Sequence, residues 1–309
     1  MKKTTLITVC LSMFGAMALP QRDALAQTQN TIHVNLGSLL PTKDEKTGKY
    51  GFTDVDGVVK IKPKYDDADI FYEGLAAVQL NGKWGFIDKN GKEIVPPRYD
   101  DSDNYTNGMV RVSLNGKWGY VDKTGKETVP VKYEHADNFY DGFGTVQFNG
   151  KWGAVDKTGK EIVPIKYDDA GKFSDGLMRV TNNGKQGFVD KTGKEIVPAK
   201  YDLAGDFSDG FAAVGLNNKY GFVNKLGKEI IPLKYDFAFT FSEGMAVVGI
   251  GGKYGFIDKT GKEVVPIQYG GIYPYGEKGH EKYGFQNGKT QVWQDGRAFY
   301  IDKTGKEVQ

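Results

Sequence analysis

The residues of this chain that could do chemistry are acidic and aromatic rather than histidine or cysteine. Its 309 residues contain 39 Asp and Glu, 18 Tyr, 18 Phe and 4 Trp, but only 3 His and 1 Cys. The histidines, His33, His135 and His280, stand at unrelated places, and no serine lies in the strand-turn-helix context of a catalytic nucleophile. No glycine-rich loop opens a helical pattern that could hold a nucleotide. The sequence therefore predicts neither an enzyme nor a cofactor.

Clusters of acidic residues are the first candidates for a metal site, because carboxylates at short spacing can ligate calcium. The clusters lie at residues 66–69, 100–104 and 168–169. None matches the twelve-residue calcium loop with its central glycine and distal glutamate. Aspartate is also a common turn residue, so we interpret these clusters as turns and predict no metal site.

A column of aromatic residues is the second candidate. An aromatic residue followed by glycine recurs every 34 residues, with a lysine before each pair, and Gln186 fills the one slot without a ring. Exposed rings at regular spacing would suit stacking on pyranose rings, whereas an aromatic residue with a large apolar residue two positions later is typical of a buried ladder. We expect the structural role for this column. Its members are Tyr50, Trp84, Trp118, Trp152, Tyr220 and Tyr254.

The 34-residue spacing indicates a chain built from internal repeats. In each unit an apolar run alternates with polar residues, as a strand with one buried face does. The pair Asn81-Gly82 joins this run to the Trp-Gly strand and predicts a hairpin turn. Residues 122–126 form a second turn pattern, and the strand that follows is expected to end at Pro130. Each unit is thus predicted to form three short antiparallel strands.

A three-stranded unit cannot bury both of its faces alone, so neighbouring units must stack. The 42 glycines and 11 prolines favour short strands with many turns over a helical bundle. We therefore predict an all-β fold of tandem 34-residue three-stranded meanders stacked as an open β-array, or solenoid. The alternative is a closed propeller-like ring of seven to eight blades, in which residues 31–36 pair with the last half unit.

The last unit departs from the repeat. Ten extra residues precede Phe285, and the polar run 289–291 replaces an apolar stretch. An insertion that stacking does not require can carry recognition, but a relaxed pattern is equally expected of a capping unit that is covered on one side only. In the first case the ligand-binding residues are Tyr273, Tyr275, His280, Tyr283 and Trp293.

Residues 83–96, which read KWGFIDKNGKEIVP, resemble the unit of bacterial WG-repeat (KWG-repeat) proteins. The resemblance extends over residues 49–309. It implies a β-rich tandem array that is common among exported bacterial proteins, and it supplies no catalytic residue. This sequence departs from the pattern at Gln186, at Ala154 after the Trp-Gly pair, at Asn224 in place of aspartate, and over residues 270–296.

The N-terminus is typical of a secretory signal. Lys2 and Lys3 precede an apolar run over residues 6–19, and small residues follow before Gln27. We predict a signal peptide over residues 1–26, cleaved after Ala26 or, as the alternative, after Ala18. We expect residues 27–48 to form an N-terminal segment with the closing strand, and residues 49–309 to form the array with its irregular final unit 270–309. The mature chain would be exported to the periplasm or beyond the cell.

The charge and hydropathy of the remaining chain exclude several kinds of partner. Without residues 1–26 the acidic and basic side chains balance, which gives no support to binding of nucleic acid or anionic membranes by bulk charge. No later segment is apolar enough to span a membrane. We expect an exported, non-enzymatic protein that presents a binding surface for a protein or polysaccharide of the cell envelope. The alternatives are a scaffold that spaces and binds envelope proteins, and a cell-wall-active hydrolase.

Overall fold

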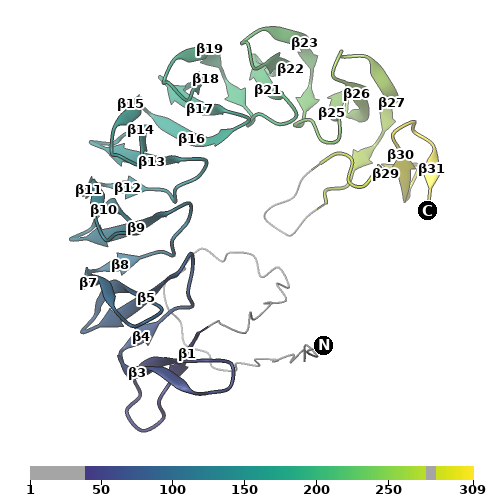
Figure 1. Ribbon diagram of the computed structural model, residues 1–309. Coiled ribbons are helices and arrows are strands. Elements are labelled where there is room, and N and C mark those ends of the chain that lie inside the picture. Colours follow the sequence, from purple (N-terminus) through teal and green to yellow (C-terminus); the bar gives the residue numbers. More distant parts are fainter. Residues whose placement is uncertain (1–38, 276–282) are drawn as a thin grey trace, which may run out of the picture. The chain divides into compact units, whose positions relative to one another are not determined.

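The computed structural model describes residues 39–275 and 283–309 (Figure 1). These residues form strands and no helix, as predicted. The proposed signal peptide and the closing strand at residues 31–36 lie outside the described residues. Figure 1 shows the sheets following one another in the order of the sequence.

Eight antiparallel sheets account for all the strands of the described residues. The first has three strands in the order β1-β2-β3 and each later one has four, also in chain order. The first four sheets contain β1 (Leu40–Lys43), β2 (Tyr50–Thr53) and β3 (Val59–Tyr65); β4 (Asp67–Ala68), β5 (Leu75–Leu80), β6 (Lys83–Asp88) and β7 (Glu93–Tyr99); β8 (Asp101–Ser102), β9 (Met109–Leu114), β10 (Lys117–Asp122) and β11 (Glu127–Tyr133); β12 (His135–Ala136), β13 (Phe143–Phe148), β14 (Lys151–Asp156) and β15 (Glu161–Tyr167). The other four contain β16 (Asp169–Ser174), β17 (Leu177–Asn182), β18 (Lys185–Asp190) and β19 (Glu195–Tyr201); β20 (Leu203–Ala204), β21 (Phe211–Leu216), β22 (Lys219–Asn224) and β23 (Glu229–Tyr235); β24 (Phe237–Ala238), β25 (Met245–Ile250), β26 (Lys253–Asp258) and β27 (Glu263–Tyr269); β28 (Gly271–Ile272), β29 (Lys289–Gln294), β30 (Arg297–Asp302) and β31 (Glu307–Val308).

The fourth strand is a difference from the three-stranded unit predicted from sequence. It is two residues long in most sheets, as in β4, and is therefore too short to show an alternating pattern. It lies in the acidic cluster 66–69, where Asp67 pairs with Gln79 and Ala68 with Val78. The acidic clusters thus contain a short strand as well as a change of chain direction.

The third strand also continues further than predicted. β11 runs through Pro130 to Tyr133 and forms the edge of its sheet, where the missing proline N–H removes no ladder bond. Trp118 pairs with Tyr133 and Tyr120 with Val129, so three residues of β11 lie opposite the single residue Gly119. The proline therefore sits in a β-bulge of an edge strand.

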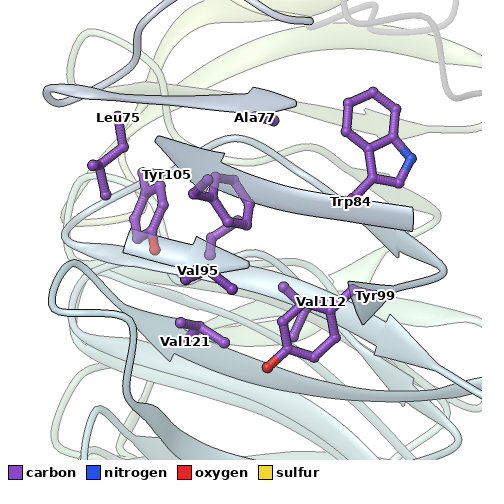
Figure 2. Close-up of a cluster of buried hydrophobic side chains, with 10 residues drawn as sticks. Leu75, Ala77, Trp84, Val95, Tyr99, Tyr105, Val112 and Val121 are labelled. Carbon is purple, nitrogen blue, oxygen red and sulfur yellow. The ribbon is translucent and has the colours of Figure 1, made fainter. Parts of the chain in front are cut away.

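Successive sheets pack face to face, which confirms the predicted stacking. In the cluster of Figure 2, Val95 and Tyr99 of one sheet pack together with Val112 and Val121 of the next. An equivalent cluster lies between each later pair of sheets. Each inner sheet buries both faces, so apolar residues occupy both sides of its strands.

Carboxylates tie the loops of successive sheets together. Glu73 accepts hydrogen bonds from the N–H groups of Asn107 and Gly108 of the next sheet, both at 2.9 Å, and pairs with Lys123 of that sheet at 2.9 Å. Glu243 makes the same contacts with Asn287, Gly288 and Lys303. Each carboxylate therefore joins two repeats through three donors.

Acid is expected to destabilise this stacking. The Lys123 ammonium and the N–H groups beside Glu73 lower the pKa of this carboxyl below its ordinary 4.5, and Lys303 does the same for Glu243. A carboxyl with a lowered folded-state pKa contributes stability above its unfolded-state pKa, and that contribution is lost as the pH falls through the folded-state value. We expect the melting temperature to stay level from pH 8 to about pH 5.5 and to fall below about pH 4.5. Thermal melts at each pH test this, and Glu73→Gln should show a shallower acid slope; equal slopes would contradict the assignment.

Candidate functional site

The aromatic column lies along the margins of the clusters between sheets. Trp84 is 8 % exposed and belongs to the core, while the other members are half-buried and pack against their clusters. The residue two positions later lies deeper, as Phe86, Tyr120 and Phe222 show with at most 1 % exposure. The column residues are therefore mostly packed rather than displayed.

Neighbouring side chains occupy the faces and edges of these rings. The guanidinium carbon of Arg111 lies 4.3 Å from the ring centre of Trp118, and the His135 ring lies 5.2 Å from Trp152 in an edge-on arrangement. In the slot without a ring, the side-chain oxygen of Gln186 accepts a hydrogen bond from the Ala204 N–H at 2.6 Å. The glutamine thereby links its sheet to the next one.

The last sheet places its indole on a different strand. Trp293 of β29 pairs with Ala298 of β30, and Ala298 occupies the slot of the aromatic column. In the six preceding sheets the partner of the column residue is small or polar; these partners are Gln79, Ser113, Gln147, Thr181, Gly215 and Gly249. Trp293 is 41 % exposed.

Trp293 and Tyr273 line a shallow slot of about 250 Å³ together with Gly270, Gly271 and Ile272. A Cβ atom on Gly270 would lie 2.6 Å from two carbons of the Trp293 ring, so the indole rests directly on this glycine. The Tyr273 N–H donates to the Gln291 carbonyl at 2.9 Å, and this bond fixes the backbone of the slot. The Tyr273 side chain is 42 % exposed.

The other residues predicted for recognition have different positions. The Tyr275 hydroxyl lies 3.1 Å from that of Ser242, and the Tyr283 ring stacks on Phe239 at 4.0 Å. Both contacts join the final unit to the preceding sheet. His280 lies outside the described residues. The structure thus brings Tyr273 and Trp293 together and places Tyr275 and Tyr283 in packing contacts.

Sequence reasoning missed two residues on the same face. Gln291 pairs with Tyr300 across β29 and β30, two rows from Trp293 and Ala298 and on the same face. Tyr300 is 40 % exposed, and the Lys289 ammonium lies 4.9 Å from its ring centre. Tyr300 occupies the position that buried Phe86 and Tyr120 hold in inner sheets, so its residue type alone does not mark it as exposed. We call the outward-facing residues Tyr273, Gln291, Trp293 and Tyr300 the terminal face.

A second hollow of about 440 Å³ lies among the loops of three successive repeats. It is lined in part by Tyr140, Asp141, Ser174 and Asp175. The polar groups are engaged: Asp141 pairs with Lys191 at 2.6 Å, the Ser174 hydroxyl donates to a backbone carbonyl, and Asp175 accepts an N–H from the next repeat. This hollow is the weaker candidate.

The acidic clusters do not assemble ligands for a metal. Within residues 39–275 and 283–309, no group of three His, Cys, Asp or Glu side chains could hold a metal ion. Asp100 of the second cluster instead binds Lys83 and accepts the N–H of Asn115, and these donors lower the pKa of its carboxyl. The same part of the chain contains no helix able to cross a bilayer.

Comparison with solved structures gives weak likenesses. Hsv2 from Kluyveromyces lactis is 10% identical with a TM-score of 0.34, over 60% of this chain and 71% of that one. AztD from Citrobacter koseri is 12% identical with a TM-score of 0.35, over 88% and 93% of the two chains. A eukaryotic initiation factor is 9% identical with a TM-score of 0.41, over 88% and 95%. Scores at this level carry no argument about function.

The family is shown by sequence instead. No curated protein matches the chain. The model of the WG containing repeat matches seven consecutive segments, at residues 50–84, 84–118, 118–152, 152–185, 187–220, 220–254 and 254–290. Each of the first six begins and ends at a residue of the aromatic column or directly beside Gln186. Since these segments tile most of the stacked sheets, the chain belongs to the family of WG-repeat proteins.

Proposed function

We propose that this protein is an exported, non-enzymatic binding protein that presents the terminal face to a protein or polysaccharide of the cell envelope. One observation carries the proposal: the indole of the last sheet lies exposed beside Tyr273 in a slot, whereas the column residues of the preceding sheets are packed. Exposed aromatic residues at the centre of a polar surface are frequent anchors of binding sites. Export is supported by the charged, apolar and small-residue pattern of residues 1–26.

A scaffold role is the second candidate. The bonds of Glu73 and Glu243 to the following repeats favour it, because they make each sheet depend on its neighbour. In that case the array would space envelope proteins, and its terminal face would be a solvated end. A wall-active hydrolase has less support, since it needs a pair of carboxyl groups free to act on a sugar. Carboxylates such as Asp100 are instead bound by a lysine of the preceding sheet and by a hairpin N–H of their own sheet.

Replacing Trp293 by alanine is expected to reduce retention of the envelope partner at least tenfold. Wild type and variant are each immobilised on a resin, and the measurement is the amount of purified wall polysaccharide, and of each defined envelope protein, that each resin retains. Because Trp293 is half exposed in the last sheet, the melting temperature of the variant should differ little from that of the wild type. Trp84→Ala is the matched control and should lower the melting temperature while sparing retention by folded protein. Equal retention by wild type and Trp293→Ala would refute the terminal face as the site.

A further inference from the structure

We infer that the terminal face binds an acidic saccharide, a pyranose ring that carries a carboxylate. This inference rests on the proposed function and specifies its ligand. It is carried by three departures from the repeat pattern. The Trp293 indole packs on Gly270, and Gly270 stands where six earlier repeats have an acidic residue. Lys253 is the equivalent of the lysine that pairs with this acidic residue, as Lys219 pairs with Asp236.

Gly270 replaces an acidic residue. The six preceding sheets each have aspartate or glutamate at the equivalent place. Each of these acidic residues forms an ion pair with a lysine of the sheet before it, the lysine that precedes the aromatic column residue or Gln186. The pairs are Lys49–Asp66, Lys83–Asp100, Lys117–Glu134, Lys151–Asp168, Lys185–Asp202 and Lys219–Asp236. The equivalent lysine of the final pair is Lys253. It has glycine opposite, and no ion pair or hydrogen bond of its ammonium is found within residues 39–275 and 283–309.

The missing carboxylate also leaves a backbone donor without its usual acceptor. Asp236 illustrates the complete arrangement, with Lys219 at 2.6 Å from one oxygen and the N–H of Gly251 at 2.8 Å from the other. At the last sheet the equivalents are Lys253 and the hairpin N–H of Asp295. Asp295 carries its own carboxylate at the exposed tip of this turn, and that group forms no ion pair with Lys253 in the described residues. A carboxylate supplied by a ligand would restore the partner that six repeats contain.

The rest of the face suits a sugar ring. Gly270 has a backbone conformation open to any residue, so its lack of a side chain serves to seat the Trp293 ring rather than to permit a turn. The indole, Tyr273 and Tyr300 offer flat surfaces for the C–H face of a pyranose. Gln291 of β29 has Tyr273, which follows β28, on one side and Tyr300 of β30 on the other, and its amide can both donate to and accept from hydroxyl groups. An extended acidic peptide would use the lysine but not this arrangement of rings around an amide.

The test measures binding by calorimetry to tetragalacturonate, to a mannuronate tetramer, to neutral chitotetraose and to a glutamate tetrapeptide. We expect an acidic sugar to bind about tenfold more tightly than chitotetraose, with affinity that falls as salt rises, and the peptide to bind no better than chitotetraose. Lys253→Gln should remove about tenfold for the acidic sugar and leave the neutral one unchanged. Lys219→Gln is the matched control, because Asp236 engages this lysine, and it should leave the affinity of the acidic sugar unchanged.

A double variant, G270D/W293Q, tests the site without threatening the fold. It gives the last sheet the same two residue types that the second sheet has at Asp66 and Gln79. The variant should therefore keep the melting temperature of the wild type but no longer bind the acidic sugar. Equal affinity for acidic and neutral sugars, binding of neither acidic sugar, or equally tight binding of the peptide would overturn the inference. If retention of an envelope partner still depends on Trp293, the proposed function stands without the acidic sugar. If retention does not depend on Trp293, both the proposed function and this inference fail.

Discussion

Replacing Phe222 by alanine is expected to lower the free energy of unfolding by about 3 to 5 kcal/mol. This side chain has no exposed surface and packs edge to face on Phe241, with ring centres 4.9 Å apart. Truncation removes its burial and leaves a cavity between two sheets that cannot close without shifting both. Because each repeat is held by its neighbours, the loss is expected to spread to the adjoining sheets.

Tyr220, the column residue two positions earlier, is the matched control. Tyr220 packs at the margin of the same cluster and is half-buried, so Tyr220→Ala should cost clearly less than Phe222→Ala. Urea titrations followed by circular dichroism measure both variants against the wild type. A larger loss for Tyr220→Ala would mean that the aromatic column, not the residue behind it, forms the centre of the core.

The regular part of the fold was predictable because its signals are local. The pair Asn81-Gly82 predicted a hairpin, and both residues have positive φ angles, 51° and 73°. Residues 122–126 were predicted to form a turn, and there the Asp122 carboxylate accepts the N–H groups of Thr124 and Lys126 while Gly125 takes the left-handed conformation. These interactions need no partner outside one unit, so the pattern of a single repeat is enough to predict them.

The depth of each residue was less predictable because it depends on neighbouring units. Inner sheets are covered on both faces, and alternation along a strand such as β6 therefore does not separate buried Trp84 from buried Ile87. The exposed terminal face was predictable only in part. Tyr273 and Trp293 were singled out because they break the repeat, but Gln291 and Tyr300 required the register of β29 and β30.

The glycine that follows each aromatic column residue and Gln186 avoids a clash between two strands. Opposite it, the edge strand bulges around proline and brings its backbone against the neighbouring strand. A Cβ atom on Gly221 would lie 2.3 Å from the Ile231 carbonyl oxygen and 2.8 Å from the Pro232 carbonyl group. All seven such glycines have a backbone atom within 2.7 Å of this position. The pair therefore encodes a close approach of two strands.

Gly221→Ala is accordingly expected to destabilise the protein by about 3 kcal/mol or more, because the atoms in contact belong to the backbone and cannot rotate away. Gly205→Ala is the matched control: its nearest neighbour would be 3.6 Å away and its backbone conformation suits alanine, so it should be close to neutral. Thermal and urea unfolding of both variants measure the difference. The last sheet fits this explanation. Phe299 occupies the position that glycine holds in the other sheets. The neighbouring strand β31 is only two residues long and pairs with Tyr300 and Ile301, so no bulge lies opposite Phe299. If Gly221→Ala unfolds like Gly205→Ala, the bulged strand yields without cost and the close approach does not explain the glycine.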